Sequence, residues 1–108
     1  MWKHVHFVET PIFTKQIDFL LEEADYRRFQ ITLALNPEAG DIIRGSGGLR
    51  KIRWSAQGRG KRGGIRIIYY LIQDNEIYLL LAYPKNKQED LTHDQLCILR
   101  NLVNEEIS

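Results

Sequence analysis

The residues of this chain that could do chemistry gather in one basic, glycine-rich segment. Eight of the fifteen lysines and arginines fall within residues 44–66, with no aspartate or glutamate among them. All eight glycines of the chain lie between Gly40 and Gly64. The formal charge of this basic segment is +8, whereas the parts before and after it carry −3 and −4. A dense positive segment in an otherwise mildly acidic chain predicts a polyanionic ligand, and phosphate is the obvious one.

The glycines also spell a nucleotide-binding pattern, but the surrounding sequence does not support that function. Gly58, Gly60 and Gly63 have the spacing of the dinucleotide fingerprint, which needs a strand before it and a helix after it. The residues that follow, Ile65 to Tyr70, are typical of a strand. We therefore expect no nucleotide cofactor.

Two basic residues are expected to point outward from a strand that covers residues 49–54. Side chains alternate between the two faces of a strand, so Lys51 and Arg53 share one face while Ile52 and Trp54 share the other. Ile52 and Trp54 are the better core candidates. Lys51 and Arg53 should therefore form an outward pair.

Arg66 lies in a second expected strand, residues 65–72, on the same face as Ile68 and Tyr70. A charge beside such an apolar wall must either pair with a buried acid or face a concave surface that receives an anion. No acid lies nearby in the sequence. We therefore favour the anion-receiving alternative.

The other basic residues carry weaker signals. Lys61 and Arg62 lie between the two strands in a glycine-rich loop, which is typical of a mobile loop that lets backbone approach a ligand. For Arg59 and Arg62 a solvated charged hairpin is the stronger interpretation. Lys85, which follows a third expected strand, either joins the same patch or is an ordinary surface lysine.

Histidine and cysteine add one candidate. His93 falls in the first turn of the last expected helix, where it is a candidate general acid or base. His4 and His6 are expected to be structural or surface residues. The three histidines and the single Cys97 lack metal-ligand spacing, so no metal site is expected. If the protein is an enzyme, its chemistry must depend mainly on lysine and arginine.

The elements that must position these residues indicate an α+β domain in the order βααβββα, with helices packed on a small, mainly antiparallel sheet. The length of 108 residues suits a single domain, residues 1–108. Thr10-Pro11 is expected to begin the first helix, and Thr92 with Gln95 forms a capping box for the last. The expected elements are a strand at 2–8, helices at 11–24, about 22–35 and from 92, and strands at 49–54, 65–72 and 77–83.

No apolar run approaches the roughly 20 residues that a membrane helix needs. The N-terminal residues also lack the apolar region of a signal peptide. We therefore expect a cytoplasmic protein without a membrane partner.

Two motifs of the basic segment, GLRKIR at residues 48–53 and GKRGGIRIIYY at residues 60–70, closely resemble those of the RelE/HigB-like toxins of bacterial type II toxin–antitoxin pairs. The resemblance extends in order over about the whole chain. It implies a microbial-RNase-like RelE toxin fold and a ribosome-dependent mRNA endoribonuclease that inhibits translation. In such toxins the 2′-OH of the substrate attacks the adjacent phosphate, without a metal or other cofactor.

The resemblance also implies roles for individual residues. Lys51 and Arg53 resemble the paired basic residues of the family's second strand, and Arg66 resembles the arginine that contacts the scissile phosphate. Lys61 and Lys85 complete the catalytic set. The expected RNA- or ribosome-binding residues are Arg44, Arg50, Arg59 and Arg62.

The chain departs from the family pattern at the expected general base. Asn86 and Thr92 stand where some relatives place an arginine and a catalytic tyrosine. A deprotonated Lys51 or Lys61, His93, or no single base all stay open as alternatives. So does a non-catalytic RNA- or DNA-binding module that uses the same basic segment.

The expected partners are mRNA, the ribosome and a cognate antitoxin, for which a HigA-like helix-turn-helix protein is the leading candidate. The sequence does not fix the codon preference, the surface that the antitoxin covers or the stoichiometry of the complex.

Overall fold

A computed structural model describes residues 4–55, 64–72 and 75–107 of the chain. Its five strands form one sheet in the order β1-β5-β4-β3-β2, antiparallel except for the parallel pair of β1 with β5. The α+β fold is as predicted. The elements are β1 (His6–Glu9), α1 (Pro11–Leu20), α2 (Glu23–Leu35), β2 (Asp41–Ile42), β3 (Leu49–Trp54), β4 (Ile65–Ile72), β5 (Glu76–Pro84) and α3 (His93–Ile107).

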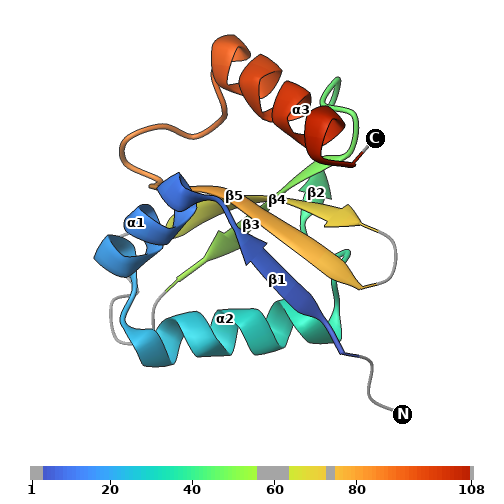
Figure 1. Ribbon diagram of the computed structural model, residues 1–108. Helices are drawn as coiled ribbons and strands as arrows, with labels where there is room; N and C mark the ends of the chain where they lie inside the picture. The colour runs from blue at the N-terminus through green and yellow to red at the C-terminus, as the bar shows by residue number, and fades with distance from the viewer. Residues whose placement is uncertain (1–3, 56–63, 73–74, 108) are drawn as a thin grey trace.

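Helices cover both faces of the sheet (Figure 1). α3 lies over one face, here called the α3 face, and α2 lies over the opposite α2 face, with α1 packed at one end of the sheet. Two apolar cores correspond to these faces. The α2-face core joins Phe13 and Ile17 of α1 and Phe29 of α2 to the sheet, and the α3-face core joins Leu99 and Val103 of α3 to it.

Side-chain caps fix where α1 and α3 begin. The Thr10 hydroxyl accepts a hydrogen bond from the Phe13 N–H at 3.0 Å and donates one to the Leu80 carbonyl at 2.9 Å. At α3 the Gln95 N–H donates to the Thr92 hydroxyl at 3.1 Å, and the Thr92 N–H donates to the Gln95 side chain at 3.0 Å. Both predicted helix starts are confirmed, since these bonds satisfy N–H groups that have no partner within the helix.

The central strand β4 sends alternate side chains to the two faces. Ile65 and Ile67 belong to the α2-face core and Ile68 to the α3-face core. A bulge then shifts the register, because Ile68 pairs with Leu81 of β5 while the next residue, Tyr69, pairs with Leu79 and so passes over Leu80. Arg66 lies two residues before Ile68, ahead of the bulge, and therefore points to the α3 face as Ile68 does.

Strand β2, Asp41–Ile42, is absent from the predicted order, because two residues are too few to show a hydrophobic pattern. It continues the sheet beyond β3. Just before it, the Gly40 N–H donates to the Tyr69 hydroxyl at 2.9 Å, and that hydroxyl donates to the Pro37 carbonyl at 2.7 Å. A side chain at Gly40 would meet the Tyr69 ring at 2.7 Å, so this close approach requires glycine.

Within the described residues, no helix has the length and apolar character that crossing a membrane requires.

Candidate active site

Strand register aligns charged and polar side chains across the α3 face. Arg53 of β3 pairs with Arg66 of β4, and Arg66 pairs with Tyr83 of β5. Lys51 lies two residues before Arg53 on the same side of β3. We call Lys51, Arg53 and Arg66 the cation cluster. Ile52 and Trp54 pack against the α2-face core instead, so the predicted division of β3 into two faces is confirmed.

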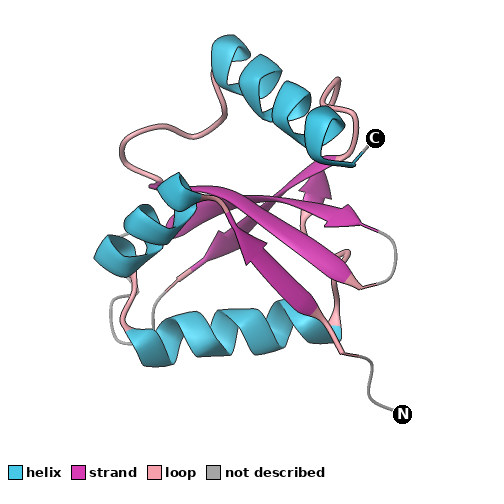
Figure 2. Cartoon of the chain, in the orientation of Figure 1, coloured by secondary structure: helices cyan, strands magenta, loops and turns pink. Residues whose placement is uncertain are grey.

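The loop between β5 and α3, residues 85–92, lies at the same end of the sheet (Figure 2). Because β4 and β5 are antiparallel, the end of β5 lies beside the beginning of β4, where Pro84 pairs with Ile65. The Lys85 N–H continues this contact by donating to the Gly64 carbonyl at 3.2 Å. The loop then brings two acids, Glu89 and Asp90, onto the cation cluster.

Arg66 forms a bidentate pair with Glu89. Its Nε donates to Glu89 Oε2 at 3.1 Å and its Nη2 donates to Glu89 Oε1 at 3.2 Å. The sequence favoured an anion-receiving Arg66 over one paired with an acid, and the structure shows the acid-paired alternative, with an acid that is half-exposed rather than buried. The acid lies 23 residues later in the sequence and is brought back by the β4–β5 hairpin. The side chain of Arg66 is only 5% exposed, whereas that of Glu89 is 46% exposed.

Lys51 and Arg53 lie on the outer side of this pair. Lys51 Nζ donates to Asp90 Oδ1 and lies 3.9 Å from Glu89 Oε2. Arg53 Nη2 lies 4.0 Å from Glu89 Oε2, and its side chain is 73% exposed against 17% for Lys51. Arg53 is thus the most accessible of the three cations, and Glu89 lies among all of them.

The charges set the protonation states of the neighbouring groups. Hydrogen bonds from Arg66 hold the pKa of Glu89 below its usual value, with help from the charges of Lys51 and Arg53. The hydrogen bond from Lys51 likewise lowers the pKa of Asp90. Burial, together with the charge of Asp90, raises the pKa of Tyr83 to about 12. At neutral pH the three residues of the cation cluster therefore face two carboxylates and a protonated tyrosine, and the six groups together keep a net positive charge.

Three of the other predicted residues lie near or within the described sheet but outside the cluster. Lys85 is exposed, at the same end of the sheet. Arg50 points to the opposite face of β3, where its guanidinium donates to the carbonyls of Gly40 at 2.8 Å and Glu38 at 3.2 Å. Arg44 is exposed in the turn before β3, at the other end of that strand from Arg53.

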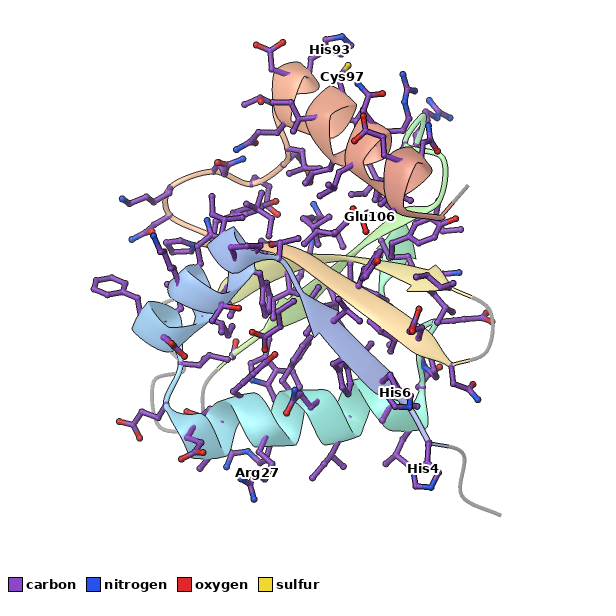
Figure 3. The ribbon with its side chains drawn as sticks, viewed as in Figure 1. His4, His6, Arg27, His93, Cys97 and Glu106 are labelled. Atoms are coloured by element: carbon purple, nitrogen blue, oxygen red, sulfur yellow. The ribbon has the colours of Figure 1, made fainter. Side chains whose placement is uncertain are left out.

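His93 is not brought to the cation cluster. It is exposed at the start of α3, with Nε2 3.6 Å from the sulfur of Cys97. Figure 3 shows both side chains on the outer side of α3, directed away from the sheet. The remaining predicted residues, Arg59, Lys61 and Arg62, lie outside the described residues.

Sequence reasoning gave no role to Glu89, Asp90 or Tyr83. One signal for them was present, because an antiparallel hairpin of residues 65–72 and 77–83 must return the residues after it to the neighbourhood of Arg66. Distance along the chain was a poor guide to pairing.

Two surface hollows lie elsewhere, one between β1, α1 and the C-terminal half of α3, and one at the turn between α1 and α2. Neither is lined by a residue of the cation cluster, of which Arg53 is the exposed member and Arg66 the buried one. The described part of the chain contains no group of three or more histidine, cysteine, aspartate or glutamate side chains placed to hold a metal ion.

Two comparisons with known proteins bear on this chain. The family model for the RelE toxin of the RelE/RelB toxin–antitoxin system matches residues 37–107, which include the whole cation cluster with Glu89 and Asp90. The fold is similar to that of Escherichia coli toxin RelE in the free state, solved as a variant with two arginines replaced by alanine. The match has a TM-score of 0.61 and 12% sequence identity, and covers 88% of this chain and 96% of that one. At this identity the likeness shows a shared fold.

Proposed function

The chain belongs to the RelE toxin family, and from this membership we propose that it is an endoribonuclease that inhibits translation by cutting mRNA on the ribosome. The observation that carries the proposal is the cation cluster, which lies within the region that the family model matches. Three cations at one end of a rigid sheet, with an exposed arginine outermost, form a site suited to a phosphate of an RNA backbone.

The reaction that fits this site is internal attack by the 2′-OH on the adjacent phosphate, which leaves a 2′,3′-cyclic phosphate and a 5′-OH. Negative charge accumulates on the phosphoryl oxygens in the transition state. Preorganised cations stabilise that charge without having to reorganise during the reaction. We assign Arg53 to this contact because it is the most exposed member of the cluster, with Lys51 beside it.

The more distant basic residues have supporting roles in this proposal. Lys85 lies at the same end of the sheet and is exposed, so it extends the positive surface along the RNA. The exposed Arg44, together with Arg59 and Arg62, is assigned to ribosomal RNA, and Lys61 stays a candidate for the catalytic set. Arg50 already donates to backbone carbonyls on the other face and is a poorer candidate for RNA.

A toxin of this family works against a cognate antitoxin. We propose a HigA-like helix-turn-helix protein as that partner. Coexpression with the product of the adjacent open reading frame should restore growth, and a stable complex should be isolated.

Cleavage in a purified translation system tests the proposed function. Addition of the protein should shorten a translated mRNA, and the same mRNA should stay intact when ribosomes are omitted. The rival hypothesis of a non-catalytic binding module predicts strongly salt-dependent RNA binding with no cleavage in either reaction. Intact mRNA on translating ribosomes, with the protein shown to be folded, would refute the nuclease proposal.

A further inference from the structure

In the Arg66–Glu89 pair the arginine is buried and the glutamate is exposed. The Arg66 side chain is 5% exposed, and its Nε and Nη2 both donate to the carboxylate. The Glu89 side chain is 46% exposed and lies among Lys51, Arg53 and Arg66. A ligand that approaches the cluster therefore meets the carboxylate before it meets Arg66.

We propose that Glu89 is the general base of the cleavage reaction, and that Arg66 is a positioning residue that acts through Glu89 rather than on the RNA phosphate. This inference rests on the proposed nuclease function. It assigns the role for which the sequence left several alternatives open, and it gives the buried Arg66 a function that its hydrogen bonds to Glu89 allow.

Other candidates in the described site fit the role less well. His93 is directed away from the sheet. Tyr83 is buried and stays protonated at neutral pH, since its pKa is raised to about 12. Lys51 is already paired with Asp90 and Glu89. Asp90 is a carboxylate, but its side chain is 74% exposed and its partner is the single ammonium of Lys51 rather than a bidentate guanidinium. Among the described residues of the site, only Glu89 combines exposure with two hydrogen bonds from a buried guanidinium.

The charge arrangement suits proton transfer to Glu89. As the 2′-O–H proton moves to the carboxylate, the 2′-oxygen bonds to phosphorus and negative charge passes to the phosphoryl oxygens. Lys51 and Arg53, which lie 3.9 and 4.0 Å from the carboxylate, then face that new charge instead. The bond from phosphorus to the 5′-oxygen breaks, the 5′-oxygen takes a proton from water, and Glu89 returns its proton to solvent.

The resting protonation state also agrees with this role. Glu89 is ionised at neutral pH, so it is ready to accept a proton. A bound phosphate would partly neutralise the surrounding cations that lower the pKa of Glu89, and so would raise that pKa. Binding of RNA thus strengthens the base at the moment it is needed.

Glu89→Gln tests the inference, because it keeps the size of the side chain and removes the base. We expect single-turnover cleavage on programmed ribosomes to fall by about 10²-fold or more, with ribosome binding retained. Glu23→Gln is the matched control: it removes a glutamate paired with Arg27 on the surface of α2 and should leave the rate unchanged. Cleavage by Glu89→Gln at or above the wild-type rate would overturn the proposal. It would mean that Glu89 only shields Arg66 from the ligand and takes no part in the reaction.

A double-mutant cycle tests whether Arg66 acts through Glu89. If it does, Arg66→Met combined with Glu89→Gln should be no slower than Glu89→Gln alone. If Arg66 contacts the phosphate independently, the two losses should multiply, and the positioning role would be rejected. Arg66→Lys serves in the same cycle if Arg66→Met fails to fold, since lysine keeps the charge but loses the bidentate fork.

Titration of the Glu89 carboxyl carbon by NMR supplies a readout that does not depend on activity. The groups that face this carboxyl are Lys51 and Arg53 from β3, Arg66 from β4, Tyr83 from β5 and the adjacent Asp90. Its pKa should be below the ordinary value in the wild type and should rise in Arg66→Lys; an unchanged pKa would contradict positioning by Arg66.

The outcomes separate the inference from the function on which it rests. If the wild type does not cut translated mRNA, the nuclease proposal itself fails. If the wild type cuts and Glu89→Gln cuts equally well, the nuclease proposal stands and the assignment of Glu89 fails.

Discussion

The two faces of the sheet are built from the same strands, β3, β4 and β5, but they serve different purposes: one is packed with apolar side chains and the other carries the charged site. On the α2 face, Ile65 and Ile67 of β4 are enclosed by side chains of α1 and α2. On the α3 face, Ile68 is equally enclosed, but Arg66, two residues earlier on the same side of β4, is covered by a loop that carries two acids. The side chains of β4 on this face change from apolar to charged at the point where the covering element changes from the helix α3 to the loop of residues 85–92.

This difference shows how one small sheet can be both stable and chemically active. The α2 face carries most of the apolar packing, so the end of the α3 face is free to hold like charges close together. Three cations at one place would repel one another if Glu89 and Asp90 did not lie between them. We therefore expect substitutions on the two faces to affect different properties.

Ile67→Ala should give the largest loss of stability. Ile67 is fully buried in the α2-face core, so the substitution leaves a cavity and should lower the free energy of unfolding by about 2–5 kcal/mol. The fraction that stays folded should cleave at the wild-type rate. Urea denaturation and cleavage assays measure the two effects. Ile31→Ala, on the exposed side of α2, is the control and should change stability by less than about 0.5 kcal/mol.

Arg53→Ala should show the opposite behaviour. Loss of one preorganised cation should slow cleavage about 10²-fold, while the free energy of unfolding should change by less than about 1 kcal/mol because the side chain is 73% exposed. Arg27→Ala is matched in exposure, at 71%, and in having a glutamate partner, yet lies on α2. It should leave cleavage intact, and equal losses in both variants would mean that general surface charge, not the cluster, is required.

Thr92→Ala tests whether the loop over the cluster depends on the start of α3. Loss of the capping box should cost about 1 kcal/mol of unfolding free energy. Cleavage should change only slightly, since Glu89 is held mainly by Arg66. Thr32→Ala, at an exposed position within α2, should not destabilise the protein in the same denaturation experiment.

The smallest effect expected is the acid dependence of stability. The pKa values of Glu89 and Asp90 are lowered in the folded protein from ordinary values of 4.5 and 3.8. Between the lowered pKa values of the folded protein and the ordinary values of the unfolded chain, the unfolded chain binds more protons. The Arg66–Glu89 and Lys51–Asp90 pairs therefore stabilise the fold fully above the ordinary values, and this contribution is lost as the pH falls through the lowered ones. Thermal melts below pH 4.5 should show a shallower decline for Glu89→Gln than for the wild type. Parallel declines would contradict the pairing with Arg66.

Local signals in the sequence predicted most of the fold. Thr10-Pro11 and the Thr92–Gln95 box fix helix starts within a few residues, and alternation along β3 correctly sent Ile52 inward. Strand β2 was missed because two residues carry no periodicity. The parallel placement of β1 beside β5 depends on long-range packing that no local pattern encodes.

The candidate site was predictable only in part, for the same reason. The positions of Lys51 and Arg53 followed from strand alternation, a local rule. The partner of Arg66 did not, because Glu89 belongs to a loop beyond the next strand and meets Arg66 only when the hairpin closes. His93 was a reasonable candidate by residue type, but its place on the outer side of α3 depends on which side of that helix packs against the sheet.

The chemistry of the cut ends tests the central claim most directly. After reaction with translating ribosomes, the upstream mRNA fragment should end in a 2′,3′-cyclic phosphate and the downstream fragment should begin with a 5′-OH. The matched reaction with Arg53→Ala should yield few such ends. Fragments with a 3′-OH and a 5′-phosphate, or equal yields from wild type and Arg53→Ala, would contradict cleavage by 2′-OH attack at the cation cluster.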